Sequence, residues 1–190
     1  MENVADVTFS DCLFENDFAI NGGGALGLKY CNATMITGCA FGDNTAYTGG
    51  AVAVLGSDYL LVFNSTFYRN RALVRSEKFF ADGGAIESDY SLQVSISDCQ
   101  FLRNEADRRG GAIALYRSNY TQISNNSFGF NRARSGGGIS IEYSNHVVVS
   151  EGVFDTNMAL SNGGGIFESE SIWVQILNVE MTGCSASEDG

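Results

Sequence analysis

The chain has 190 residues, 44% of them hydrophobic and 12% aromatic, which is enough apolar material for one domain with a sizeable core. Its net charge of −11 argues against nucleic acid as the main partner, because phosphate binding requires a net basic surface. No apolar run is long enough to span a membrane, and the opening residues, MENVADVTFS, do not resemble a secretory signal.

The first expected element is a core strand containing Val7 and Phe9, and a recurring unit begins after it. The unit opens with F-x-x-N-x-A, in which Asp17 replaces the Asn in the first copy. A short connection follows, then two glycines, a small residue and a branched apolar residue, and 15 residues later the next Phe. The unit repeats every 26 or 27 residues with one exception, which indicates a structure built from stacked copies.

Large apolar residues occupy fixed positions in this unit. Ten residues after the branched apolar residue there is always Ile or Val, and the alternation around this position predicts a strand with one buried face. The aromatic positions predicted to stack in the interior are Phe14, Phe41, Phe67, Phe101, Phe128 and Phe154. The residues that close the glycine motifs are Leu26, Val52, Ile86, Ile113, Ile139 and Ile166.

A period of this length, with short strands and turn residues at fixed offsets, is typical of a solenoid. Helical repeats are longer, and their apolar residues recur about every 3.6 residues. A propeller blade needs about 40 residues, so neither architecture fits this repeat. We therefore predict an all-β fold, a right-handed parallel β-helix of six to seven rungs, over residues 1–190 as a single domain. The glycines are expected at tight corners, and the Asn column as a hydrogen-bonded ladder.

The paired GGA[ILV] and FxxN motifs resemble the repeats of the chlamydial polymorphic membrane proteins and of related surface proteins. The resemblance covers essentially the whole chain. It implies a β-helical, non-enzymatic adhesive segment located outside the cell or on its surface. Neither end has a recognisable cap, so we expect a fragment of a longer solenoid, with further repeats or other protein chains stacked at its ends.

The main alternative is a carbohydrate-active enzyme, a polysaccharide lyase or a glycoside hydrolase. Asp98 and Glu151 share a column, but Asn125 lies between them, and a catalytic pair requires closer carboxylates. Ser144 and His146 lack an acid to complete a triad, and the serine column suits turn-stabilising hydroxyls. We therefore expect no catalytic residue, cofactor or metal. A weak calcium site is an alternative for three acids near the N-terminal end, Glu15, Asp17 and Asp43.

A glycan-binding module is a further alternative, because aromatic side chains that face outward can stack on sugars. The candidate stacking residues are Tyr59, Tyr120 and Trp173. Secretion by a eukaryote would make four sequons available for N-glycosylation, at Asn32, Asn64, Asn119 and Asn125. Cys12 and Cys39 fall in adjacent rungs, within the Cα distance of a disulfide, although small buried thiols are the simpler interpretation.

One connection breaks the repeat, and residues 70–82 are predicted to form an inserted longer loop. Basic residues gather there and in the two connections that follow. Two interpretations remain open: a network of intramolecular salt bridges, and a basic patch that binds an acidic glycan or the acidic flank of a neighbouring molecule. The residues of this predicted patch are Arg69, Arg71, Arg75, Lys78, Phe79, Phe80, Arg103, Arg108, Arg109, Arg132 and Arg134.

Overall fold

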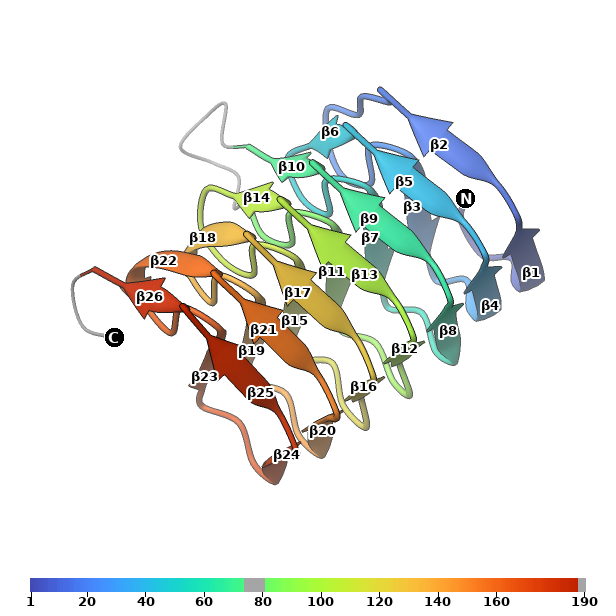
Figure 1. Ribbon diagram of the computed structural model, residues 1–190. Coiled ribbons are helices and arrows are strands. Elements are labelled where there is room, and N and C mark those ends of the chain that lie inside the picture. The colour runs from blue at the N-terminus through green and yellow to red at the C-terminus, as the bar shows by residue number, and fades with distance from the viewer. Residues whose placement is uncertain (74–80, 188–190) are drawn as a thin grey trace.

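The computed structural model describes residues 1–73 and 81–187. These residues wind into a parallel β-helix, in which each turn of the chain lies against the one before it (Figure 1). Four parallel sheets of six or seven strands run the length of the solenoid, which confirms the predicted fold class and the predicted number of rungs. Within the described ranges, no helix is long and apolar enough to cross a membrane.

Two of the sheets, A and B, are built from the longer strands. Sheet A contains β3 (Leu26–Lys29), β7 (Val52–Leu55), β11 (Ile86–Asp89), β15 (Ile113–Tyr116), β19 (Ile139–Glu142) and β23 (Ile166–Ser169). Sheet B contains β1 (Ala5–Ser10), β4 (Asn32–Thr37), β8 (Leu60–Phe63), β12 (Ser95–Ser97), β16 (Gln122–Ser124), β20 (Val147–Ser150) and β24 (Val174–Leu177). Each turn passes from sheet A to sheet B through a corner that contains a serine or cysteine.

The other two sheets, C and D, complete each turn with shorter strands. Sheet C contains β2 (Leu13–Glu15), β5 (Ala40–Gly42), β9 (Thr66–Tyr68), β13 (Gln100–Leu102), β17 (Ser127–Gly129), β21 (Val153–Asp155) and β25 (Glu180–Thr182). Sheet D contains β6 (Thr45–Ala46), β10 (Arg71–Ala72), β14 (Glu105–Ala106), β18 (Arg132–Ser135), β22 (Met158–Asn162) and β26 (Ser185–Ala186). The glycine pairs lie in the connection from sheet D back to sheet A.

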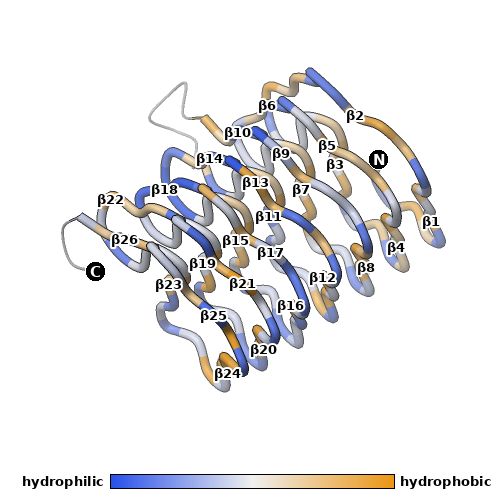
Figure 2. The backbone as a smooth tube through the Cα atoms, in the orientation of Figure 1, coloured by the Kyte–Doolittle hydropathy of each residue, from blue (hydrophilic) through white to orange (hydrophobic). Residues whose placement is uncertain are grey.

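The interior is filled by like residues stacked on like. The predicted phenylalanine column is confirmed, because the rings from Phe14 to Phe154 stack with centroid separations of 4.4–5.0 Å. The strand registers also place Ile and Val of one turn directly on Ile and Val of the next. Figure 2 shows hydrophobic positions recurring at equivalent places in successive turns. Burial of these columns supplies the main stabilisation of the solenoid.

The Asn column forms the expected ladder at the corner between sheets C and D. Asn104 is wholly buried, and its amide nitrogen donates to the Phe67 carbonyl and to Asn131 Oδ1, each at 3.0 Å. Its Oδ1 accepts from both the backbone and the side-chain nitrogens of Asn70. The same pattern in the neighbouring turns satisfies corner groups that would otherwise be buried without partners.

The two glycines of each motif have different roles. Gly83 has a φ of 67°, in the left-handed region that favours glycine. Gly84 instead packs so closely on the next turn that a Cβ there would clash with the Gly111 carbonyl oxygen. The repeated motif is therefore explained by one left-handed residue and one close backbone contact in every turn.

The disulfide considered for Cys12 and Cys39 is absent, since all five cysteines are free thiols. The two residues do lie in adjacent turns, and the Cys12 backbone nitrogen donates to Cys39 Sγ at 3.4 Å. Side chains in register on parallel strands point the same way and stay about 4.8 Å apart, whereas disulfide bonding brings Cβ atoms to about 3.8 Å. Within the predicted loop at 70–82, Asn70 belongs to the buried ladder and Arg71–Ala72 forms strand β10, while residues 74–80 lie outside the described residues.

Candidate functional site, a groove on sheet A

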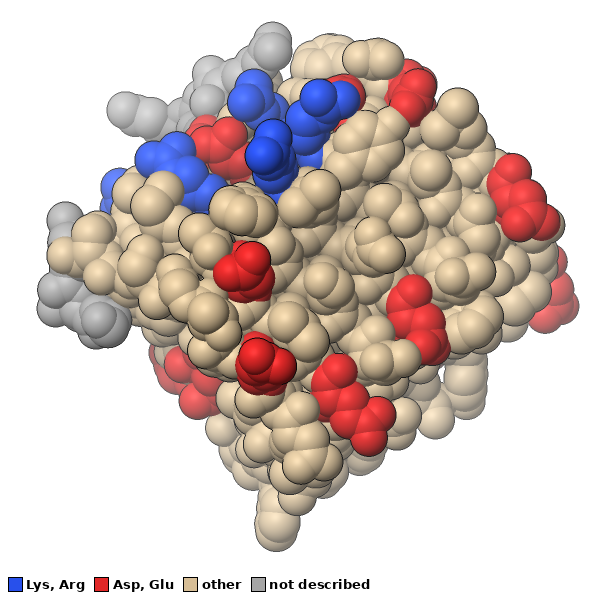
Figure 3. All heavy atoms as spheres, viewed as in Figure 1, with Lys and Arg blue, Asp and Glu red and all other residues tan. Residues whose placement is uncertain are grey.

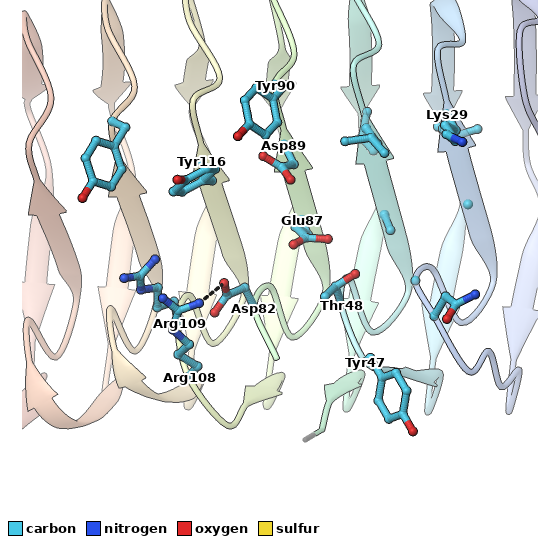
Figure 4. Close-up of a pocket in the computed structure, with 18 residues that line it drawn as sticks. Lys29, Tyr47, Thr48, Asp82, Glu87, Asp89, Tyr90, Arg108, Arg109 and Tyr116 are labelled. Atoms are coloured by element: carbon cyan, nitrogen blue, oxygen red, sulfur yellow. Dashed lines mark hydrogen bonds and ion pairs between the residues drawn. The ribbon is translucent and has the colours of Figure 1, made fainter. Parts of the chain in front are cut away.

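A groove of about 860 Å³ follows the outer face of sheet A. Its floor is made of outward-facing residues of the strands, one side is formed by connections from sheet D, and the other by the corner towards sheet B. The residues that line it are Asn21, Gly22, Gly27, Leu28, Lys29, Tyr47, Thr48, Ala53, Val54, Leu55, Asp82, Glu87, Asp89, Tyr90, Arg108, Arg109, Tyr116 and Tyr143 (Figure 4).

Strand alternation explains which residues form the floor. In β11, Ile86 and Ser88 are wholly buried in the interior, so the alternating residues Glu87 and Asp89 face outward. The position of Glu87 is held by Ala53 in the preceding turn and by Ala114 in the following turn. Small neighbours on both sides leave the Glu87 carboxyl at the bottom of the groove.

Two ion pairs lie along the side formed by the sheet D connections. Asp82 accepts from Arg108 at 3.2 Å, and Arg109 pairs with Glu142, whose side chain is 3% exposed. Burial raises the pKa of Asp82 to about 6, although the two arginines oppose the rise. Burial also raises the pKa of Glu142, again opposed by Arg109. Both ion pairs lie in a partly desolvated part of the groove, where removing one partner would leave an unpaired charge at a high cost in free energy.

The two acids on the floor have no such basic partner. In the described part of the chain, neither Glu87 nor Asp89 forms an ion pair. Burial raises the pKa of Glu87 to about 8, and the neighbouring Asp82 and Asp89 add to the rise, while Thr48 opposes it. Burial raises the pKa of Asp89 to about 6, with Arg117 opposing. At neutral pH the floor therefore presents a mainly protonated Glu87 beside a mainly ionised Asp89.

Tyrosines form the side of the groove towards sheet B. The Tyr90 and Tyr116 rings meet edge to face at 5.8 Å, and Tyr116 meets Tyr143 in the same way at 5.4 Å. The Arg117 guanidinium lies 5.3–5.8 Å from the centroids of all three rings and ties them together through cation–π contacts. The groove thus combines an aromatic side with hydrogen-bonding and charged groups on its floor and opposite side, as ligand sites commonly do.

The predicted basic patch is divided by the fold. Figure 3 shows Lys and Arg side chains gathered on one part of the visible surface, while acidic residues are spread over the rest of that face. Arg69 pairs with Asp43 at 2.7 Å, and Glu105 bridges Arg71 and Arg132 at 3.5 and 2.9 Å. These contacts support the salt-bridge interpretation. Of the remaining patch residues, Arg103 lies over the Phe130 ring and Arg134 is exposed. Arg108 and Arg109 line the groove. The other four lie outside the described residues: Arg75, Lys78, Phe79 and Phe80.

The predicted stacking aromatics lie at the corner between sheets A and B. Tyr120, His146 and Trp173 form a continuous stack, with centroid separations of 4.9 and 6.3 Å. They border a shallow pocket of about 300 Å³. Tyr59 is 60% exposed but is separated from this stack by the turn that carries Gln93. Every member of this column has a positive φ, which explains why the side chains project from the corner.

The residues weighed for catalysis or metal binding have structural contacts. Asp98 accepts a hydrogen bond from Asn125, and Ser144 is wholly buried with its hydroxyl donating to the Glu142 carbonyl. Glu15 accepts from the Tyr68 hydroxyl and Asp43 pairs with Arg69, and residues 1–73 and 81–187 contain no cluster of metal-binding side chains. Among the sequon residues, Asn119 is half-buried and three are exposed, Asn32 at the start of β4 and Asn64 and Asn125 at corners.

The acids of the groove floor were not among the sequence-predicted sites. A signal was present, because a glutamate stands in the column one residue after the glycine motif, where other turns have mostly small residues such as Gly27, Ala53 and Ala114. Asp89 stands two residues further along, on the same face of the strand.

Comparison with known families gives one finding. A family model described as "Right handed beta helix region" matches residues 1–154, most of the chain and the whole of the groove. No curated protein matches the sequence.

Proposed function

The chain belongs to the right-handed β-helix family, and on that premise we propose that it is a non-enzymatic adhesive segment, displayed outside the cell, whose sheet A groove binds a carbohydrate. The observation that carries the proposal is the groove itself, about 860 Å³ in volume, with tyrosines along one side and carboxyls on its floor. Sugars have apolar ring faces that pack on aromatic side chains and hydroxyls that donate to carboxylates.

The location and adhesive role draw on the sequence motifs. The paired GGA[ILV] and FxxN repeats resemble those of chlamydial polymorphic membrane proteins and related surface proteins. A rigid solenoid suits adhesion because stacked turns carry a binding face far from its point of attachment. In a longer protein, further repeats would stack on the terminal turns. Nucleic acid does not fit a partner role, given the net charge of −11.

The charges around the groove favour a sugar that is not acidic. Five arginines of the predicted patch pair with acids, so their charge is largely compensated: Arg69, Arg71, Arg108, Arg109 and Arg132. The groove floor carries unpaired acids instead. An acidic glycan, the ligand suggested by counting basic residues, is therefore the weaker candidate.

A carbohydrate-active enzyme is the second candidate, because Glu87 and Asp89 have pKa values raised to about 8 and about 6. Two neighbouring carboxyls with different pKa values can act as the general acid and the general base of an enzyme. However, both residues project from one face of β11, whereas the two carboxyls of a glycosidase flank the scissile bond from different sides. This arrangement favours binding without hydrolysis.

A glycan panel tests the proposal. Immobilised neutral, acidic and amino sugars are screened with the protein and with Tyr116→Ala, which shortens the aromatic side of the groove. Trp173→Ala is the matched control, because it removes an exposed aromatic outside the groove. Selective binding that weakens only in Tyr116→Ala is expected. Binding lost only in Trp173→Ala, or no retention of any glycan, would contradict the proposed site. Release of new reducing ends that ceases in Glu87→Gln would favour the enzyme.

A further inference from the structure

We propose that the floor of the sheet A groove recognises a primary ammonium group, carried by an amino sugar, which binds beside Glu87 and Asp89. The inference rests on the proposed carbohydrate groove and specifies the class of sugar. It follows from three features of the described residues: the balance of charge on the floor, buried carboxyl oxygens without hydrogen-bond partners, and the aromatic side of the groove.

The charges in the groove do not balance on the floor. The cations that line it already have acidic partners: Arg108 pairs with Asp82, Arg109 with Glu142, and Lys29 with Glu2 at 3.0 Å. Among residues 1–73 and 81–187, no cation pairs with Glu87 or Asp89, and the charged groups that most influence Glu87 are the acids Asp82 and Asp89. A bound cation at this point would gain Coulomb energy from a partly desolvated acidic site, where screening by water is weak.

Hydrogen bonding points to the same kind of ligand. The Oδ1 atoms of Asp82 and Asp89 are buried, and neither has a hydrogen-bond partner within the described part of the chain. A carboxylate can only accept, so each of these oxygens requires a donor. The terminal torsion of Asp has a broad, two-fold energy profile, so rotation of the carboxyl can turn either oxygen to the groove. An ammonium group supplies three donors in a compact volume and could satisfy Asp89 while contacting Glu87.

The surroundings of the floor suit the rest of a sugar. Tyr90 follows Asp89 directly in the chain and belongs to the aromatic side, so a ring whose amine reaches Asp89 can pack on tyrosine. Thr48 lies across the floor next to Glu87 (Figure 4) and offers a hydroxyl. A bare amine would use the acids but not the aromatic side, and for this reason we assign the ammonium group to a sugar.

The same groups discriminate against related sugars. A carboxylated or sulfated sugar would bring a second negative charge beside Asp89, which is mainly ionised at neutral pH. An N-acetylated sugar retains the ring but replaces the ammonium with a neutral amide, whose hydrogen bonds to carboxylates are weaker than charge-assisted ones. Free amino sugars should therefore bind more tightly than their N-acetylated forms, by on the order of tenfold for each charge-assisted bond lost.

Titration calorimetry with two trisaccharides tests the inference. A β-1,4-linked trimer of glucosamine and its fully N-acetylated counterpart share a backbone and differ at the nitrogen. The structure predicts at least tenfold tighter binding of the glucosamine trimer. Asp89→Asn, which removes the carboxyl that is mainly ionised at neutral pH, should reduce its affinity to that of the acetylated trimer, while leaving acetylated binding unchanged. Glu87→Gln has the shape of the protonated carboxyl and should change the affinity much less. Glu151→Gln, an exposed acid on another corner, is the matched control and should have no effect.

Each outcome separates the inference from the proposed function. Equal affinity for both trimers, or tighter binding of the acetylated one, overturns the amino-sugar inference and leaves a carbohydrate groove. If neither trimer binds while another glycan of the panel does, the inference fails and the proposed function stands. A third ligand, the linear diamine cadaverine, lacks a sugar ring. If it binds as tightly as the glucosamine trimer, the tyrosines contribute nothing and the assignment to a sugar is wrong.

Discussion

Replacing Glu87 with glutamine is expected to remove much of the pH dependence of folding stability. The Glu87 pKa is about 8 in the folded chain, because of burial, compared with an ordinary value of 4.5. Between these two pH values the folded state keeps a proton that the unfolded state has released, so stability falls as the pH rises. Each pH unit corresponds to about 1.4 kcal/mol, so the loss over the whole window is on the order of 4 to 5 kcal/mol.

Urea unfolding from about pH 5 to about pH 8 measures this effect. Glutamine has the same shape as protonated glutamate, so the variant should match the wild type near pH 5 and exceed its free energy of unfolding by several kcal/mol near pH 8. Asp82 and Asp89, whose pKa values are about 6, face Glu87 and leave a smaller slope below that pH in both proteins. Exposed Glu151, changed to glutamine, is the control. Parallel stability curves for the wild type and Glu87→Gln would refute the reasoning.

Three other predictions concern the scaffold and its thiols. Asn104→Ala removes the acceptor of the buried Asn70 backbone amide and should lower the free energy of unfolding by about 3 kcal/mol, whereas Asn125→Gly at an exposed corner should cost under about 1 kcal/mol; equal effects in urea unfolding would contradict the ladder. Phe101→Ala should cost about 3 to 5 kcal/mol by the same measurement, and a loss below about 1 kcal/mol would contradict tight ring stacking. The Cys99 thiol, buried with a pKa raised to about 12, should react with a thiol reagent only on unfolding, so rapid reaction in the native protein would contradict its burial.

Repeat spacing was sufficient to predict the solenoid and its core. A residue of a parallel β-helix lies on the equivalent residue of the next turn, so a column in the sequence becomes a column in space. Phe67, Phe101 and Phe128 stack as their spacing predicted, with ring separations of 5.0 Å. The Asn column was predicted for the same reason. Such features depend only on the repeat register.

The groove could not be predicted in this way, because it depends on how each corner directs its side chains. Arg108 and Arg109 lie in the same segment as the predicted patch residue Arg103, yet they line the groove, where they pair with Asp82 and Glu142. Their direction is decided by the corner geometry and by acids contributed from other turns. Glu87 stands out in the sequence as an acid in a column of mostly small residues. Its burial, however, depends on the flanking connections, whose positions the sequence does not reveal.

The most direct test of the account is a crystal structure of the protein grown with the glucosamine trimer. The account predicts density along the outer face of sheet A, with the sugar against the side formed by Tyr90 and Tyr116 and an amine nitrogen within hydrogen-bonding distance of the Glu87 and Asp89 carboxyls. Trimer density at the Tyr120 and Trp173 corner, with the groove occupied only by water, would contradict it.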